Sequence, residues 1–319
     1  MTITAPPAPV DAPAEELVRE RFRPRLPARL GGLLTPRTVA KRPPVATSLP
    51  IWVLRGVAGL AAWLLFYAFA LSAVQEHRAQ AVLYSHFREQ LALATAPISG
   101  PIGTGKPVAL VNAPVIGLKN LIVSEGTDSG TLRSGPGHRR DTVLPGQAGI
   151  SVVYGRSATF GAPFGQLRDM QAGDLIAVTT GEGEFNYKVE DVREAGDPLP
   201  PALATGGSRL VLETSTGSSW RSGFAPGHVL YVDARLTGPA VPSGTTVALL
   251  AHERAMSSDS GGLTGLVLWL EGLLLVALGL VWARTRWGKW QAWIVGAPLL
   301  LFLVWGATSA GADLLPNLV

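Results

Sequence analysis

Three long apolar stretches interrupt an otherwise mixed pattern of hydrophobic and polar residues. They cover residues 51–74, 262–283 and 290–310, and the charged residues inside them are Arg55, near the start of the first, and Glu271, deep in the second. About 20 apolar residues are enough for a helix to cross the hydrocarbon core of a bilayer. The pattern therefore predicts three transmembrane helices. Because the first stretch is too long for the apolar part of a signal peptide, we expect it to remain as an anchor.

The region between the first two spans has a different pattern, in which short runs of strand-forming residues alternate with turn residues. In one run Phe185, Tyr187 and Val189 alternate with polar residues, which predicts a strand with one buried and one wet face. Strands are predicted at 108–111, 121–123, 150–154, 175–179, 185–192, 209–214 and 228–235. Many short strands with little helical periodicity are typical of an antiparallel sandwich or barrel. We therefore predict an all-β fold for residues 105–237, accompanied by the three transmembrane helices.

The remaining segments are predicted to connect these parts. Residues 1–50 are rich in proline and lack any regular hydrophobic period, which is typical of a disordered arm. Residues 75–104 and 238–261 are expected to be linkers, residues 284–289 a short loop, and residues 311–319 a tail.

Basic residues gather beside the apolar stretches. Residues 19–42 carry eight Lys and Arg side chains against one Glu, and the loop 284–289 is basic and contains no acid. Short loops rich in Lys and Arg stay on the cytoplasmic side of a membrane. Both signals place the N-terminus in the cytoplasm, and three crossings then place the strand-rich region and the tail 311–319 outside. We expect a multi-pass protein of the cell membrane.

Composition narrows the chemistry further. Of 319 residues, 47% are hydrophobic and 16% charged, and no aromatic residues are interleaved with the basic ones as nucleic-acid binding would require. The chain has no cysteine, which excludes disulfides, thiolate metal sites and a thiol nucleophile. Its five histidines show no metal-ligand spacing. We expect no metal, no cofactor and no nucleic-acid partner; the expected partners are the lipid bilayer and an envelope or membrane protein.

The strand-rich region also carries an ordered set of glycine- and proline-containing motifs. They are Gly135-Pro136-Gly137-His138, Leu144-Pro145-Gly146-Gln147 and Gly161-Ala162-Pro163-Phe164, followed by Leu167 and Ala172-Gly173-Asp174. In this order and spacing they resemble the sortase family, especially the housekeeping-type sortases of actinobacteria. The resemblance covers residues 105–236. It implies a closed eight-stranded barrel and an extracytoplasmic transpeptidase.

The resemblance further implies three catalytic positions, a His, a Cys and an Arg. In this sequence those positions hold Arg156, Ser215 and His228. A serine hydroxyl needs a general base, whereas a guanidinium stays protonated and cannot accept a proton. The sequence therefore predicts a domain that has lost the catalytic Cys and His.

Six residues are candidates for lining a binding groove: His138, Arg156, Glu213, Ser215, Arg221 and His228. His138 is expected either to order the turn before it or to contact a ligand. Glu213, Arg221 and Arg156 are expected to form an ion-paired cluster or an anion site. His228 is expected at the surface, the alternative being a Ser–His pair with Ser215. Glu271 is expected to contact another helix inside the membrane.

Three functions follow from these residues. The first is a membrane-anchored, catalytically degenerate sortase-like protein that binds a cell-envelope or secreted polypeptide or scaffolds a membrane complex. The second is a serine-dependent acyltransferase or hydrolase that uses Ser215. The third is an accessory subunit of a membrane transport complex, defined by the helices and Glu271.

Overall fold

The computed structural model of the chain describes the greater part of it. The described residues are Thr2 and 54–55, 58–63, 65–216, 228–257 and 262–318, without the side chains of Ala68 and Phe69. Apart from Thr2, the arm expected to be disordered lies outside them. The described residues beyond Gly56 belong to one compact unit.

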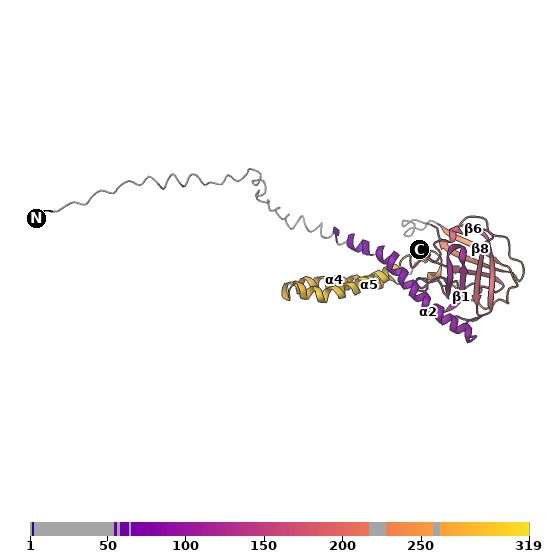
Figure 1. Cartoon of the computed structure of the whole chain (residues 1–319), viewed down its shortest axis with the longest axis horizontal. Coiled ribbons are helices and arrows are strands. Elements are labelled where there is room, and N and C mark those ends of the chain that lie inside the picture. Colours follow the sequence, from indigo (N-terminus) through magenta and orange to yellow (C-terminus); the bar gives the residue numbers. More distant parts are fainter. Residues whose placement is uncertain are drawn as a thin grey trace, which may run out of the picture. The chain divides into compact units, whose positions relative to one another are not determined.

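Eight strands close into a barrel in the order β1-β2-β3-β4-β7-β8-β6-β5 (Figure 1). Neighbouring strands pair antiparallel, except that β2 runs parallel to β3 and β4 parallel to β7. The strands are β1 Pro107–Ala113, β2 Leu118–Glu125, β3 Gly137–His138, β4 Gly149–Tyr154, β5 Leu175–Thr180, β6 Gly183–Glu194, β7 Ser208–Ser215 and β8 Val229–Leu236. The predicted closed barrel is confirmed.

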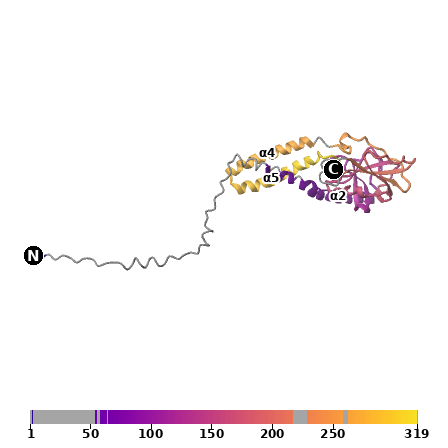
Figure 2. The ribbon, with the colours of Figure 1, turned by 90° about the horizontal axis from the view of Figure 1, so that it is seen from above.

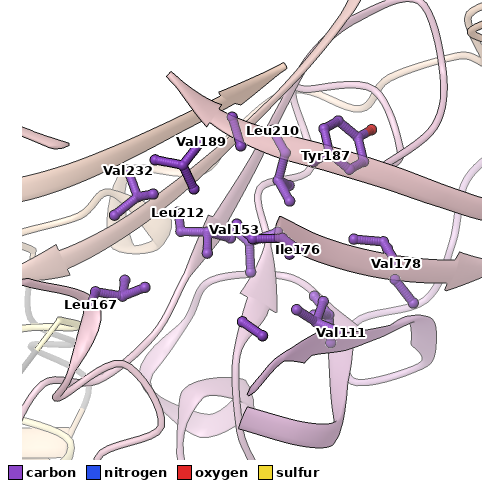
Figure 3. Close-up of a cluster of buried hydrophobic side chains, with 14 of the residues drawn as sticks. Val111, Val153, Leu167, Ile176, Val178, Tyr187, Val189, Leu210, Leu212 and Val232 are labelled. Atoms are coloured by element: carbon purple, nitrogen blue, oxygen red, sulfur yellow. The ribbon is translucent and has the colours of Figure 1, made fainter. Parts of the chain in front are cut away.

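The core of the barrel is built from alternating side chains of these strands. In β7, Leu210 and Leu212 belong to the inner cluster, so Val211 between them faces outward. Figure 3 shows Val153, Leu212 and Val232, from three neighbouring strands, pointing into the same cluster. Every residue of β7 is nevertheless buried, which means that other segments cover the outer face of this strand.

A long helix that precedes the barrel in the chain packs against it. The π-helical turn η2, Tyr67–Leu71, leads into α2, Ser72–Ala92. Phe87 of α2 is fully buried against strands β1 and β2. The Gln80 side chain accepts a hydrogen bond from Ile122 N at 2.8 Å and donates one to Ser134 O at 2.8 Å. The first part of the segment expected to be a linker is therefore a docked helix.

Residues 238–257 also run back over the barrel. Val241 forms a parallel bridge with Gln147, and its carbonyl accepts a hydrogen bond from Ala148 N at 2.8 Å. Further along, Glu253 O accepts a hydrogen bond from the Thr127 hydroxyl at 2.6 Å. The remaining short helices are η3 Pro114–Ile116, α3 Ser129–Leu132, η4 Leu167–Asp169 and η5 Ala251–Glu253.

Two C-terminal helices are long and apolar enough to cross a membrane. They are α4, Gly262–Arg286, and α5, Lys289–Ala312, and both views show them side by side (Figures 1 and 2). Glycines allow the close approach, since a Cβ at Gly306 would meet the Trp269 ring at 2.5 Å. The Trp269 and Phe302 rings pack edge to face, 5.6 Å apart. A membrane anchor that follows the barrel is supported.

The expectation of an all-β protein with three spans needs correction. The chain as a whole is not all-β, because α2, α4 and α5 are long helices, and the described residues contain two candidate spans rather than three. Several residues of the predicted span 51–74 lie outside the described part. The helix there does not stop at Val74 but continues through η2 and α2 to Ala92, on a sequence that becomes charged.

Candidate functional site

The ends of β4 and β7 lie side by side and bring the expected catalytic positions together. In the parallel register, Tyr154 pairs with Glu213, so residues 155–157 continue next to Ser215. Gly155 N donates to Glu213 O at 3.0 Å. A Cβ at Gly155 would meet the Phe164 ring at 2.3 Å, so this position accepts only glycine without movement of the ring.

Ser215 lies on the outer face of the barrel and is buried under the C-terminal segment. Its hydroxyl oxygen is 2.5 Å from that of Ser157 and donates a hydrogen bond to Leu318 O at 3.0 Å. The Leu318 carbonyl also accepts from Ser157 N at 3.1 Å, and its oxygen lies 3.2 Å from the Ser157 hydroxyl oxygen. One of the two hydroxyls donates to the other across 2.5 Å, so the peptide carbonyl accepts from the Ser157 N–H and from one hydroxyl, at the position where the resemblance expects the nucleophile.

Arg156 is fully buried beneath this surface. Its guanidinium donates to the Ser129 hydroxyl at 3.0 Å and the Thr159 hydroxyl at 3.2 Å, and it stacks 4.8 Å from the centre of the Phe160 ring. Burial, and secondarily the charge of Arg133, lower the pKa of Arg156 to about 9. The side chain therefore stays protonated at neutral pH and cannot serve as a base.

His228 is an exposed residue just before β8. Its backbone bonds with Thr216, which donates from its main-chain N to His228 O at 2.7 Å. In the described part of the chain, no imidazole or carboxylate is hydrogen-bonded to Ser215 or Ser157. A Ser215–His228 pair is thus not formed. Arg221 lies outside the described residues.

His138 joins the barrel to the loop that follows β3. Its Nδ1 lies 2.8 Å from Glu125 Oε2, and its Nε2 lies 2.9 Å from Val143 O. Both ring nitrogens are thus engaged within the barrel and the side chain is buried. The side chain therefore fixes the loop that follows β3, whereas the expectation was that it orders the turn before it.

Glu213 belongs to a polar cluster on the outer face, which contains Arg139, Tyr154, Arg193 and Asp233 besides Glu213 itself. Burial raises the pKa of Glu213 to about 7, although Arg139 and Arg193 oppose the shift. Arg193 donates to Asp233 Oδ2 at 2.6 Å. Arg156 bonds to other residues, so the expected pairing of Glu213 with Arg156 is not seen.

Comparison with known proteins identifies the barrel. Residues 111–223 match the family model described as a sortase domain. The barrel is a sortase-family domain. Sortase D of Bacillus subtilis (strain 168) is 31% identical over 86 residues, which are 27% of this chain and 41% of that protein. The match therefore spans about two fifths of that relative's length.

Solved sortase structures also resemble the chain. A Clostridium perfringens sortase D5 transpeptidase is 20% identical and aligns over 50% of this chain and 99% of that chain, with a TM-score of 0.41. Sortase E from Streptomyces avermitilis is 30% identical over 43% of this chain and 91% of that chain, with a TM-score of 0.35.

Three residues of this sortase domain and its extension were missed by reasoning from sequence. Ser157 follows Arg156 directly and could have been found by extending the motif by one residue. Asn317 and Leu318 belong to a segment assigned as a tail. The signal there was its three leucines, which a fully solvated tail does not need.

The arrangement can bind a peptide carbonyl without any metal. Among the described residues, no three His, Asp or Glu side chains lie close enough to hold a metal ion. The donors are the Ser157 N–H and one hydroxyl of the Ser157–Ser215 pair, both held next to the ends of β4 and β7. Such donors polarise a carbonyl, whereas covalent catalysis would also need a base beside Ser215.

Proposed function

We propose that this protein is a membrane-anchored sortase-like module that binds an extended polypeptide segment in the sortase groove and does not perform transpeptidation. The observation that carries the proposal is the Leu318 carbonyl held by Ser157 and Ser215, with the protonated Arg156 buried behind them. The groove retains peptide-binding contacts, while the described residues provide no base for Ser215.

Chemistry supports the loss of activity. General-base assistance contributes typically 10²–10⁴ in rate, and here a hydroxyl without a base stands where the resemblance expects a thiolate. The missing base and the weaker nucleophile both slow the same step, the attack on the peptide carbonyl. A polypeptide of the cell envelope or a membrane-protein partner is the proposed ligand.

The proposed topology retains a third membrane helix at residues 51–74. In support, Trp63 Nε1 donates to the Thr308 hydroxyl at 3.2 Å, and the Tyr67 and Trp305 rings lie 5.4 Å apart, edge to face. The helix before α2 therefore packs against α5, which is itself a candidate span. Together with the basic flanks, this favours a cytoplasmic N-terminus and a sortase domain outside the cell.

A turnover assay on the full chain in detergent micelles tests the proposal. The probe is a quenched fluorogenic peptide with a sortase sorting signal, with and without an amine acceptor, and an active sortase is run alongside. Neither the native chain nor Leu318→Asp, in which the covering segment is loosened, should release product. Turnover by either chain that disappears on adding Ser215→Ala would establish a serine-dependent acyltransferase or hydrolase instead.

A further inference from the structure

The segment that follows α5 fills the groove of the sortase domain. Asn317 and Leu318 are both fully buried. We propose that the groove recognises an Asn followed by a large aliphatic residue, and that its resident ligand is the chain's own segment Asp313–Leu318. This inference rests on the proposed function, in which the groove binds a polypeptide, and it names that ligand.

The Leu318 side chain occupies an apolar pocket on the outer face of the barrel. The pocket is formed by buried residues of α3, β4, β7 and β8, namely Leu132, Val152, Tyr154, Val211 and Val229. The Leu318 carbonyl bonds with Ser157 and Ser215, as described above. A large aliphatic side chain fills this pocket, whereas a charged one would be buried without a partner.

The Asn317 side chain is selected by hydrogen bonds rather than by shape. Its Nδ2 donates to His252 O at 2.8 Å, to Arg254 O at 2.9 Å and to the Ser257 hydroxyl at 3.1 Å. Its main-chain N donates to Ser257 O at 3.1 Å. An aspartate has the same shape but would direct a carboxylate oxygen at two carbonyl oxygens, so the pocket favours Asn over Asp.

The segment is also fixed where it leaves the membrane helix. Arg133, which follows α3, forms an ion pair with Asp313 and donates to Ser309 O at 2.8 Å. Pro316 restricts the backbone just before the buried pair. The position of the segment in the groove is thereby coupled to the end of α5.

Both the segment and the loop that binds Asn317 lie outside the residues that match the sortase family model, 111–223. The loop belongs to the returning segment 238–257. The Asn-binding half of the site is therefore built by this chain's own extension of the domain.

A ligand joined to its own receptor acts at a high effective concentration. An external polypeptide with the same Asn-aliphatic pattern must displace the segment before it can bind. Movement of α5 relative to Arg133 would release the segment and open the groove. The structure thus represents the closed state of the site.

Thiol protection tests this proposal, because the native chain contains no cysteine. In the full chain in detergent, Ser215→Cys should react slowly with a water-soluble maleimide. Adding Leu318→Asp or Asn317→Asp should raise the rate at least about tenfold, the effect of losing ~1.4 kcal/mol of binding. Leu199→Asp, the same change at an exposed residue outside the segment, should leave the rate unchanged. Ala234→Cys, buried in the barrel core, controls for general unfolding, because it should stay unlabelled in all these variants unless the barrel opens.

A peptide added in trans tests the specificity of the groove. A synthetic peptide of residues 313–319 should restore protection of Ser215→Cys in the Leu318→Asp background, and the same peptide with Asp in place of Asn317 should not. Equal labelling rates with and without Leu318→Asp or Asn317→Asp would overturn the proposal, as would equal protection by the two peptides. Such a failure is separate from failure of the proposed function, which is decided by turnover of the sorting-signal peptide.

Discussion

At the scale of single residues, Arg156 has a structural role beneath the surface that carries Ser215. Its guanidinium bonds with Ser129 and Thr159 and stacks on Phe160. Arg156→Ala should lower the free energy of unfolding by roughly 2–4 kcal/mol, because it leaves a cavity and an unpaired buried hydroxyl. Arg156→Met retains most of the volume and should cost less. Chemical denaturation followed by tryptophan fluorescence measures both, and equal stability of the native chain and Arg156→Ala would contradict this role.

Glu213 should make stability depend on pH. Burial raises its pKa to about 7 in the folded state, above the ordinary value of ~4.3. The folded state therefore holds more protons than the unfolded state between these values, and stability falls as pH rises from about 4.5 to 7. Burial also raises the pKa of Glu76 to about 7, so the informative quantity is the difference between the native chain and Glu213→Gln.

Unfolding midpoints measured from pH 4.5 to 8 give this difference. Glu213→Gln should lose less stability than the native chain over that range, because a neutral amide does not titrate. Parallel pH profiles for the two proteins would show that Glu213 is not held protonated by the fold.

At the scale of elements, the strands could be predicted from the alternation of hydrophobic and polar residues. The segments that cover the barrel could not. Each predicted strand segment lies within an observed strand, apart from His228 at the start of the last. Strand β3 was missed because two residues show no period. Helix α2 from residue 75 on and residues 238–257 were expected to be linkers, yet side chains such as Gln80 and Glu253 bind them to the barrel, and single contacts of this kind leave no periodic pattern.

Prediction of the residues around Ser215 was limited in the same way. The motifs placed Ser215 and Arg156 next to each other because neighbouring strands carry them. The partner of Ser215 could not be predicted, because Leu318 is 103 residues away in sequence and reaches the groove only through the membrane hairpin. Contacts of this kind depend on tertiary packing and leave no local pattern.

Gln80 provides a test of how α2 is attached. Gln80→Ala removes its hydrogen bonds to Ile122 and Ser134 and leaves buried backbone groups unpaired, which should cost about 1–3 kcal/mol. Amide hydrogen exchange should accelerate in α2 and at Ile122. The matched control is Gln75→Ala, at an exposed position of the same helix. Unchanged protection in Gln80→Ala would mean that apolar packing alone holds the helix.

Glu271 tests the role of α4. It is an exposed position of this helix, while the next residue, Gly272, approaches Leu303 of α5, so a contact with a partner helix remains the expectation. Glu271→Gln should be tolerated because it keeps a hydrogen-bonding group. Glu271→Lys should reduce accumulation in the membrane, since a Lys at the helix centre costs ~3 kcal/mol. Similar levels of the two variants on immunoblots of membranes would contradict a helix contact at Glu271.

At the scale of the whole molecule, the account requires the sortase domain to lie outside the cell and the N-terminal arm inside. A cysteine at the exposed Thr205 should react with an impermeant thiol reagent on intact cells, whereas one at Ser48 should react only after lysis. The cysteine-free background makes the labelling specific. Labelling of position 48 alone on intact cells would reverse the orientation.

The central claim is that the groove binds a peptide without performing chemistry on it. Native mass spectrometry of full-length Leu318→Asp, incubated for hours with a stoichiometric amount of the 313–319 peptide, tests it most directly. We expect a noncovalent complex from which the intact peptide is released on activation, with the protein mass unchanged. A covalent adduct that is lost on adding Ser215→Ala, or a shortened peptide, would contradict the account.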